Sequence, residues 1–275
     1  MAKIRESLNY EKEIARDPLS FPRSFLTNGR ETSEIEAIAL FSASLAYGRV
    51  ELFMGVISEI LEKCNGHFLK LITGKEKIDK WPGYRLSSSQ EIKDFALSIG
   101  KVIQEKGGIR KSFLNGYLKE KSIKDGFIQL RNDLLNASSK QLTRGFLHLV
   151  PDPGKGGAQK RWSLFLRWMV RENDGLDLGL WKDVKPSELV VPIDRHIGRI
   201  CRALGFTQRK SDDWKTAIEI TEALRQLSPN DPLVYDFPLC HLGISKNCEY
   251  GKTPEKCRCC ELKILCQYGK NITGR

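Results

Sequence analysis

The sequence predicts an all-α protein, and three observations support this. Apolar residues recur every three or four positions in a series of segments along the 275-residue chain. Gly, Pro, Ser or Asn bounds each of these segments, as expected at helix ends. No apolar–polar alternation of useful length predicts a strand. With 40% hydrophobic residues, the chain can bury the core of one large domain or of two smaller ones.

The first strong helix signals lie in residues 32–48 and 50–66. The first segment is expected to open with a capping box formed by Ser33 and Glu36, because a Ser followed three positions later by Glu typically begins a helix. Glycines end both segments, and glycine commonly stops a helix.

Six further segments have the same helical pattern and similar boundaries. They are residues 88–108, 109–120, 123–139, 160–172, 194–205 and 212–227. The expected loops concentrate in "LVPDPGKGGA", "ENDGLDLGLWKDVKPSE" and a cysteine-rich tail. Tyr84, Trp162, Trp168 and Trp181 are expected to fill the core rather than to stack on a ligand.

Charge and hydropathy favour a cytoplasmic protein with a polyanionic partner. No apolar run reaches the length of a membrane span, and the N-terminal residues are charged throughout, with no apolar signal segment. The formal net charge of +11 suggests nucleic acid as one such partner. A reducing compartment favours thiols as metal ligands over disulfides.

Four of the cysteines have the spacing of a metal site. Cys248, Cys257, Cys260 and Cys266 leave gaps of eight, two and five residues. Thiolates on a short loop suit a [4Fe–4S] cluster or tetrahedral zinc. Structural zinc sites usually join two C-x-x-C turns, but this tail has one such turn and a last cysteine on an expected helix, "CELKILC". The pattern therefore favours the iron–sulfur cluster and keeps zinc as the alternative.

Other cysteines are expected to have different roles. Cys259 lies between two proposed ligands and is expected to point away from them. Cys240, in the apolar stretch "DFPLCHLGI", and Cys64, within a helical segment, are expected to pack as ordinary thiols.

The cysteine tail resembles the iron–sulfur loop of the endonuclease III and adenine glycosylase group. In that group the first gap is normally six residues, and the other two gaps are the same as here. The preceding "YDFPLCHLGISKNC" is similar to the helix that leads into the loop. The resemblance implies a [4Fe–4S] cluster on Cys248, Cys257, Cys260 and Cys266, and a two-domain helix-hairpin-helix DNA glycosylase-like fold.

A second motif, "VVPIDRHIGRICRALGF", resembles the segment of these glycosylases that carries the catalytic aspartate. The matching residue here is Asp194. From the sequence alone, Asp194 is an N-cap that accepts hydrogen bonds from first-turn amides. A carboxylate at a helix N-terminus stays ionised and can stabilise positive charge on a deoxyribose as the base departs, so the two roles are compatible.

The segment "VPDPGKGGAQKRWSLFLRWMVR" is similar to the family's DNA-binding hairpin. In that group a glycine-rich turn offers amides to a DNA phosphate, and a lysine at the start of the next helix enters the active site. The implied residues are Gly154, Lys155, Gly156, Gly157 and Arg161 for phosphate and Lys160 for catalysis. The second hairpin glycine falls on Ala158, and Lys160 lies 34 positions before Asp194, about twice the usual distance. Lys160 could instead be a phosphate-contacting lysine.

Both segments that the resemblance assigns to DNA are positively charged. Residues 153–171 contain five basic side chains and no acidic one, and residues 246–275 contain seven basic and three acidic ones. Lys252, Lys256 and Arg258 of the tail are expected to contact phosphates.

Over nearly its full length, the chain looks similar to an uncharacterised bacterial family within this superfamily. The shared motifs are "DPLSF" from Asp17, Glu34 to Gly48, Gly83 to Arg85, Lys160 to Arg171 and Tyr235 to Gly243. This likeness predicts the fold and no particular activity.

These patterns together predict a domain arrangement and a function. Residues 16–172 are expected to form a helical barrel that ends in the hairpin, and residues 1–15 with 173–275 the cluster domain. The predicted function is base excision by a DNA glycosylase, with or without AP-lyase activity, on a flipped base in double-stranded DNA. A non-catalytic DNA-binding protein with the same fold is the alternative. The protein is expected to be a monomer and to associate with the nucleoid.

Overall fold

The computed structural model describes residues 9–138, 141–245 and 247–273. In this part of the chain helices account for 62% of the residues and there is no strand. Two isolated bridges, Tyr84–Ser87 and Gly157–Asp213, are the extended pairings found there. The predicted all-α class is confirmed. Among the described residues, no helix combines the length and the apolar content that a membrane crossing requires.

The chain divides into two compact units, which are described separately. The N-terminal unit comprises Ile14–Lys155 and Trp168–Lys182, and the C-terminal unit comprises Met1–Glu13, Gly156–Arg167 and Asp183–Arg275. The prediction placed all of residues 16–172 in the first domain. The structure instead groups the first eight residues of the helix that begins at Lys160 with the C-terminal unit.

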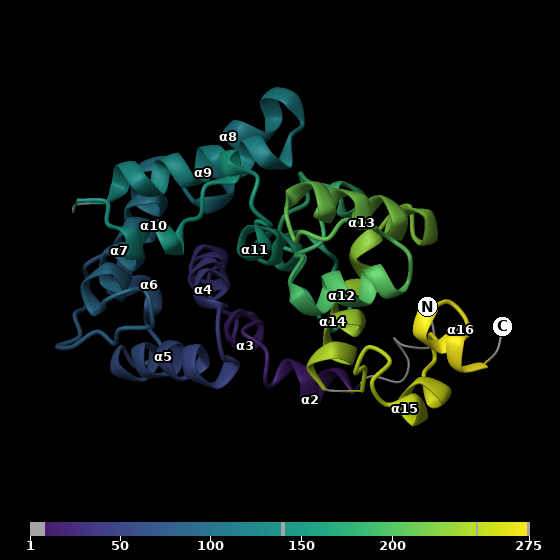
Figure 1. The fold of residues 1–275 in the computed structure, drawn as a ribbon. Coiled ribbons are helices and arrows are strands. Elements are labelled where there is room, and N and C mark those ends of the chain that lie inside the picture. The colour runs from purple at the N-terminus through teal and green to yellow at the C-terminus, as the bar shows by residue number, and fades with distance from the viewer. Residues whose placement is uncertain (1–8, 139–140, 246, 274–275) are drawn as a thin grey trace. The chain divides into compact units, whose positions relative to one another are not determined.

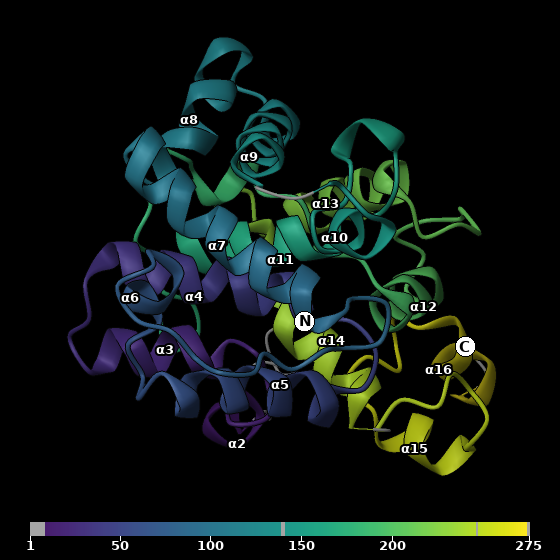
Figure 2. The same ribbon diagram turned by 90° about the vertical axis from the view of Figure 1, so that its left-hand side faces the viewer.

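The N-terminal unit is built from eight α-helices and one 3-10 turn within the described residues. They are α3 (Ser20–Thr27), α4 (Thr32–Leu45), α5 (Val50–Lys63), α6 (Phe68–Ile72), α7 (Ser89–Lys106), α8 (Ile109–Glu120), α9 (Ile123–Ala137), α10 (Arg144–Leu149) and η1 (Pro153–Lys155). Helices α8 and α9 lie side by side (Figure 1 and Figure 2). Gly116 permits this approach, because a Cβ there would lie 2.3 Å from the Asp125 carbonyl oxygen.

The expected capping box at the start of α4 is wrong. The helix begins at Thr32, and its N-cap, Glu31, makes no side-chain capping bond. Glu36 is buried and accepts a hydrogen bond of 2.7 Å from Trp181 Nε1. Every residue from Glu34 to Leu45 is buried, so α4 is a central helix without a solvent face, and tertiary contacts replace local capping.

The C-terminal unit is also helical. Its elements are α2 (Tyr10–Ile14), α11 (Lys160–Val170), η2 (Pro186–Glu188), α12 (Arg195–Ala203), α13 (Trp214–Leu227), η3 (Pro232–Tyr235), α14 (Asp236–Ile244), α15 (Pro254–Cys259) and α16 (Gln267–Thr273). Helix α11 belongs to this unit as far as Arg167. Apolar side chains of α12, α13 and α14 form its core with Val190, Val191 and Ile193. Helix α12 packs on α14, and α15 lies beside α16 at the yellow end of the ribbon (Figure 1).

Two short contacts attach the N-terminal segment to α14. The Tyr10 ring stacks on Phe237 with ring centroids 5.8 Å apart. Glu13 Oε2 lies 2.9 Å from His241 Nδ1. The C-terminal unit therefore contains both ends of the described chain.

The large aromatic side chains behave as predicted. Trp162, Trp168, Trp181 and Tyr84 are all buried within the part of the protein that the structure describes. A fully buried aromatic side chain of this kind removes about 150–250 Å² of surface from water. These four residues are therefore not available to stack on a ligand.

Candidate functional site

The candidate site is an ion pair between Lys160 and Asp194 in the C-terminal unit. Lys160 is the first residue of α11, and its Nζ lies 2.8 Å from Asp194 Oδ2. The two side chains are 35% and 18% exposed, so part of the pair is open to solvent and to a bound molecule. The structure thus brings together two residues that lie 34 positions apart.

Asp194 takes its position from the local sequence. Pro192 favours an extended backbone for Val191, which precedes it, and the Val191 amide donates a hydrogen bond of 3.0 Å to Thr221 Oγ1. Helix α12 begins immediately after Asp194, which is its N-cap, as predicted. Asp194 Oδ1 accepts hydrogen bonds from the amides of His196, at 2.9 Å, and Ile197, at 3.0 Å. One carboxylate oxygen caps the helix, and the other holds Lys160.

This environment keeps the Asp194 carboxylate ionised. Burial acts to raise its pKa, but the charge and hydrogen bond of Lys160 and the Ile197 amide outweigh burial and hold the pKa below its ordinary value. A stably ionised carboxylate can stabilise a cation that develops beside it. The same carboxylate favours the protonated form of Lys160.

The glycine turn before α11 differs in part from the predicted phosphate site. Gly156 has a φ of 74°, a backbone conformation that favours glycine, and both Gly156 and Gly157 are exposed. Gly154 and Lys155 belong to the N-terminal unit. The Gly154 amide donates a hydrogen bond of 2.8 Å to Asp152 Oδ1, so it is not free to meet a phosphate in this structure.

Residue Gln159 directly precedes the site lysine and has an unusual backbone. Its φ is 53°, in the left-handed region that residues with a side chain rarely adopt, and it is 7% exposed. A non-glycine residue in this conformation persists when its surroundings hold it there, and such residues cluster at functional sites.

A group that the sequence did not predict lies beside Asp194 on α12. His196 Nδ1 is 3.2 Å from the hydroxyl of Tyr250, and the Arg199 guanidinium lies 4.1 Å from the Tyr250 ring centroid. A Cβ at Gly243 would approach His196 Nδ1 to 2.9 Å, so glycine there makes room for the pair. Because Tyr250 follows Cys248 by two residues, it connects the cysteine tail to the helix that Asp194 caps.

The four predicted ligands lie near one another in the cysteine tail. Cys248 and Cys260 pack against the apolar core of the C-terminal unit. Burial raises the pKa of Cys248, and the charges of Cys260, Cys266 and Cys257 raise it further. Among the described residues, no group of three His, Cys, Asp or Glu side chains is arranged to hold a metal ion. None of the eight cysteines forms a disulfide in this structure.

Several details of the tail differ from the sequence prediction. Residues 260–266 form turns and not the expected helix, whereas Cys257 lies on the short helix α15. Lys256 Nζ pairs with Glu249, which reduces the charge it can offer to a phosphate. Lys252 and Arg258 are exposed.

Cys64 and Cys240 agree with their predicted roles. Cys64 is buried, and burial raises its pKa to about 11. Cys240 packs against the core of the C-terminal unit, and Cys259 is exposed.

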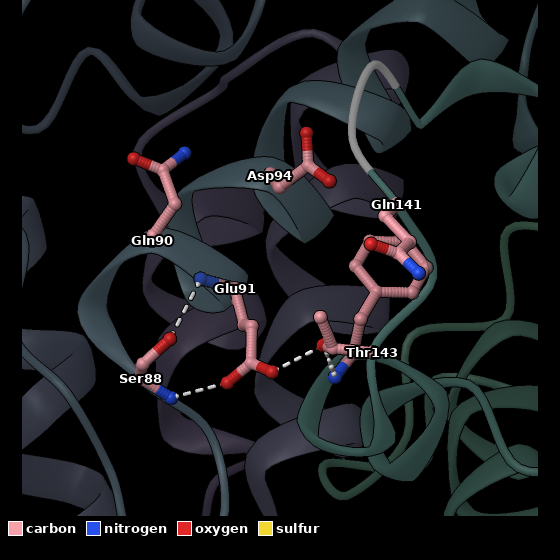
Figure 3. A pocket seen from close by; sticks show the side chains of 7 residues that line it. Ser88, Gln90, Glu91, Asp94, Gln141 and Thr143 are labelled. Atoms are coloured by element: carbon pink, nitrogen blue, oxygen red, sulfur yellow. Dashed lines mark hydrogen bonds between the residues drawn. The ribbon is translucent and has the colours of Figure 1, made fainter.

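A separate cavity of about 330 Å³ lies in the N-terminal unit (Figure 3). Three of its polar side chains, Ser88, Glu91 and Thr143, serve helix capping. Ser88 and Glu91 form a capping box on α7, with the Ser88 amide 2.6 Å from Glu91 Oε2. Thr143, the N-cap of α10, donates its hydroxyl to Glu91 and accepts from the Phe146 amide. The cavity therefore lies at the N-terminal ends of α7 and α10.

Comparison with protein families gives one match. A family described as "Protein of unknown function (DUF2400)" matches residues 17–245. The chain belongs to this family. No curated protein and no solved structure matches the chain. The matched residues of this DUF2400 protein include Lys160 and Asp194 and end before Cys248.

Proposed function

We propose that this DUF2400 protein is a DNA glycosylase with AP-lyase activity and that Lys160 and Asp194 are its catalytic residues. The observation that carries the proposal is the 2.8 Å ion pair between an accessible lysine and a carboxylate fixed by two helix amides. The resemblance of both segments to helix-hairpin-helix glycosylases supports it. Such a pair offers one nucleophile and one group that stabilises a cation.

The order of steps follows from the charge state of the pair. Asp194 favours protonated Lys160, and the nucleophile must be a neutral amine. The C1′–N glycosidic bond breaks first, its electron pair leaves with the base, and Asp194 stabilises the sugar cation. The departing base takes a proton from Lys160 Nζ. The neutral amine then forms a bond with C1′, and opening of the sugar ring gives a Schiff base.

Borohydride trapping tests this mechanism. Duplex DNA that contains an abasic site, together with a panel of oxidised, deaminated and alkylated bases, is incubated with the protein and then reduced. A covalent adduct that disappears in Lys160→Ala supports the proposal. Native protein without any adduct or base release, or an undiminished adduct in Lys160→Ala, removes Lys160 from this role.

A non-catalytic DNA-binding protein is the second proposal, and the same ion pair favours it in one respect. Because Asp194 favours the positively charged form of Lys160, this side chain could contact a phosphate as well as act as a nucleophile. Binding to the abasic duplex without base release or trapping on any DNA of the panel would support this alternative.

We also propose that Cys248, Cys257, Cys260 and Cys266 hold a [4Fe–4S] cluster, with zinc as the alternative metal. The chemistry of the donor set supports this proposal, because four thiols in one short tail are ligands that both an iron–sulfur cluster and zinc accept. Cys259, the fifth thiol of this tail, is exposed. Four thiolates would hold the cluster, and this ligation would stabilise the fold of a tail that contains few apolar residues. Glycosidic bond cleavage is not a redox reaction, so the proposed role is structural.

A matched pair of substitutions tests the cluster. Cys257→Ser should lose most of the metal and lower the melting temperature, whereas Cys259→Ser should keep both. The native protein, purified anaerobically, should be brown and contain about four irons per chain. One zinc per chain and no iron would show that the bound metal is zinc. Equal metal loss in Cys257→Ser and Cys259→Ser would contradict the proposed ligand set.

A further inference from the structure

The loop of residues 207–213 connects α12 to α13 and pairs with the glycine turn. Asp213 forms an antiparallel bridge with Gly157, and the Trp214 amide donates a hydrogen bond of 3.1 Å to the Gly156 carbonyl oxygen. No local pattern predicts this pairing, because more than fifty residues separate the two segments. The exposed turn before Lys160 therefore has a neighbouring backbone segment within the same unit.

The side chain of Arg202 holds the 207–213 loop in a defined shape. Its Nε donates to the Arg209 carbonyl oxygen at 2.5 Å. Its Nη2 lies 3.1 Å from the Lys210 carbonyl oxygen, 3.0 Å from that of Ser211 and 2.6 Å from Asp212 Oδ1. One guanidinium thus organises four consecutive residues and pairs with the first of two acidic side chains.

The second acidic side chain, Asp213, is fully used by neighbouring donors. Its Oδ1 accepts the Thr216 amide at 2.9 Å and so caps α13. Its Oδ2 accepts the Ser211 hydroxyl at 2.7 Å and Arg209 Nη2 at 2.8 Å. These hydrogen bonds hold the pKa of Asp213 well below its ordinary value, led by the Thr216 amide. The two carboxylates of the loop are thereby paired with arginines, Asp212 with Arg202 of α12 and Asp213 with Arg209 of the loop.

Positive charge remains on this surface after these pairings. Lys210 and Lys215 are exposed, and neither makes an ion pair with any residue that the structure describes. The Arg209 side chain is 38% exposed. The loop backbone is fixed, while Lys210 on the loop and Lys215 in the first turn of α13 stay in solvent. Such a surface suits a partner that offers negative charges without a particular sequence.

We infer that the 207–213 loop, with Lys210 and Lys215, is a second binding site for the phosphate backbone of DNA beside the glycine turn. The inference deepens the proposed function and rests on DNA as the partner. The bridge to Gly157 carries it, because a strand that reaches Lys160 past the exposed Gly156 and Gly157 would meet this loop next. Nucleic acid is favoured over an acidic protein because the loop adjoins this turn and has no apolar anchor of its own.

The test measures the salt dependence of DNA binding. The probe is a fluorescent duplex with a stable tetrahydrofuran abasic analogue, and the Kd of the full-length protein is measured by anisotropy across a salt series. In Lys210→Ala/Lys215→Ala, the slope of log Kd against log salt should fall by about 1.8, the value expected for two phosphate contacts. A control, Lys75→Ala/Lys119→Ala, removes two exposed lysines of the N-terminal unit and should keep the native slope.

Borohydride trapping on abasic DNA at saturating protein distinguishes this inference from the proposed function. A reduced slope in the loop variant with full trapping supports both. A reduced slope with no trapping, even in the native protein, supports the loop as a phosphate site and contradicts the lyase. An unchanged slope with normal trapping overturns the loop inference alone. Native protein that binds no DNA and instead binds polyglutamate through Lys210 overturns both in favour of an acidic partner.

Discussion

Helix α11 carries two ion pairs that differ in their exposure to solvent. At its first residue, Lys160 pairs with Asp194, and the side chains are 35% and 18% exposed. Two turns later, Arg167 Nη1 lies 2.5 Å from Asp236 Oδ2, and each of these side chains is 3% exposed. Both carboxylates begin a helix of the C-terminal unit. In both pairs the carboxylate lies at the start of a helix, but the two pairs differ in how far their side chains are exposed to water.

Their different burial implies different roles. A fully buried pair must be satisfied within the protein, because an isolated buried charge is costly. The Arg167 guanidinium also lies 5.8 Å from the Phe237 ring centroid, so one aromatic ring packs beside the pair. A partly exposed pair contributes little to stability, and its groups remain available to a ligand. We therefore expect the Lys160 pair to serve chemistry and the Arg167 pair to serve folding.

The largest expected effect is on chemistry, in Lys160→Ala. Without the amine, trapping on abasic DNA should fall by about 100-fold or more. The free energy of unfolding should change by less than about 1 kcal/mol, because Asp194 keeps its two amide donors. Trapping and urea unfolding, with Lys119→Ala as the control, measure both quantities. A large loss of stability in Lys160→Ala would erase the contrast between the two pairs.

The next effect is on stability, in Arg167→Met. This change leaves Asp236 buried without its ion-pair partner and should lower the free energy of unfolding by about 3–5 kcal/mol. Arg161→Met, on a half-buried arginine of the same helix, is the control and should lower it by less than about 1 kcal/mol. Urea unfolding followed by circular dichroism compares them. Equal effects would show that burial does not separate the two ends of α11.

Removal of both charges at the buried pair sharpens the comparison. Arg167→Met/Asp236→Leu should recover most of the stability lost in Arg167→Met and come within about 2 kcal/mol of the native protein. A double variant no more stable than Arg167→Met would show that packing, and not the uncompensated Asp236 charge, causes the loss.

The smallest effect is the pH dependence of the Asp194 pair. Because the pKa of Asp194 is lowered in the folded protein, its ionisation contributes stability above the unfolded pKa of about 4. This contribution is lost as pH falls through the folded pKa. Asp194→Asn keeps an N-cap oxygen but has no charge. Its difference in stability from the native protein should therefore be largest near pH 7 and shrink below about pH 4.

A stability difference between native protein and Asp194→Asn that stays constant from pH 7 to pH 3 would contradict the lowered pKa. The same variant should lose base excision at pH 7, because Asn cannot stabilise a developing cation as a carboxylate does.

Local patterns predicted several parts of the fold and of the candidate site. The N-cap role of Asp194, the helix that begins at Lys160 and the burial of Trp162, Trp168 and Trp181 all followed from residues close in sequence. Helix caps depend on hydrogen bonds within one turn, and apolar periodicity identifies a buried face. Such features can be recognised without knowing what lies on the other side of the element.

Other features depended on contacts between distant segments. The expected Ser33–Glu36 cap failed because Trp181 binds Glu36, and the helix expected after Cys260 is a series of turns. The His196–Tyr250 contact and the bridge from Gly157 to Asp213 each join segments more than fifty residues apart.

By itself, the sequence determined the all-α class, the N-cap at Asp194 and the types of residue at the site. Only the tertiary structure decided that Lys160 meets Asp194 while Arg167, on the same helix, meets Asp236. The physical reason is that a capping bond is made within one helical turn, whereas an ion pair forms only where the packing of whole helices places two charges together and sets how much water reaches them.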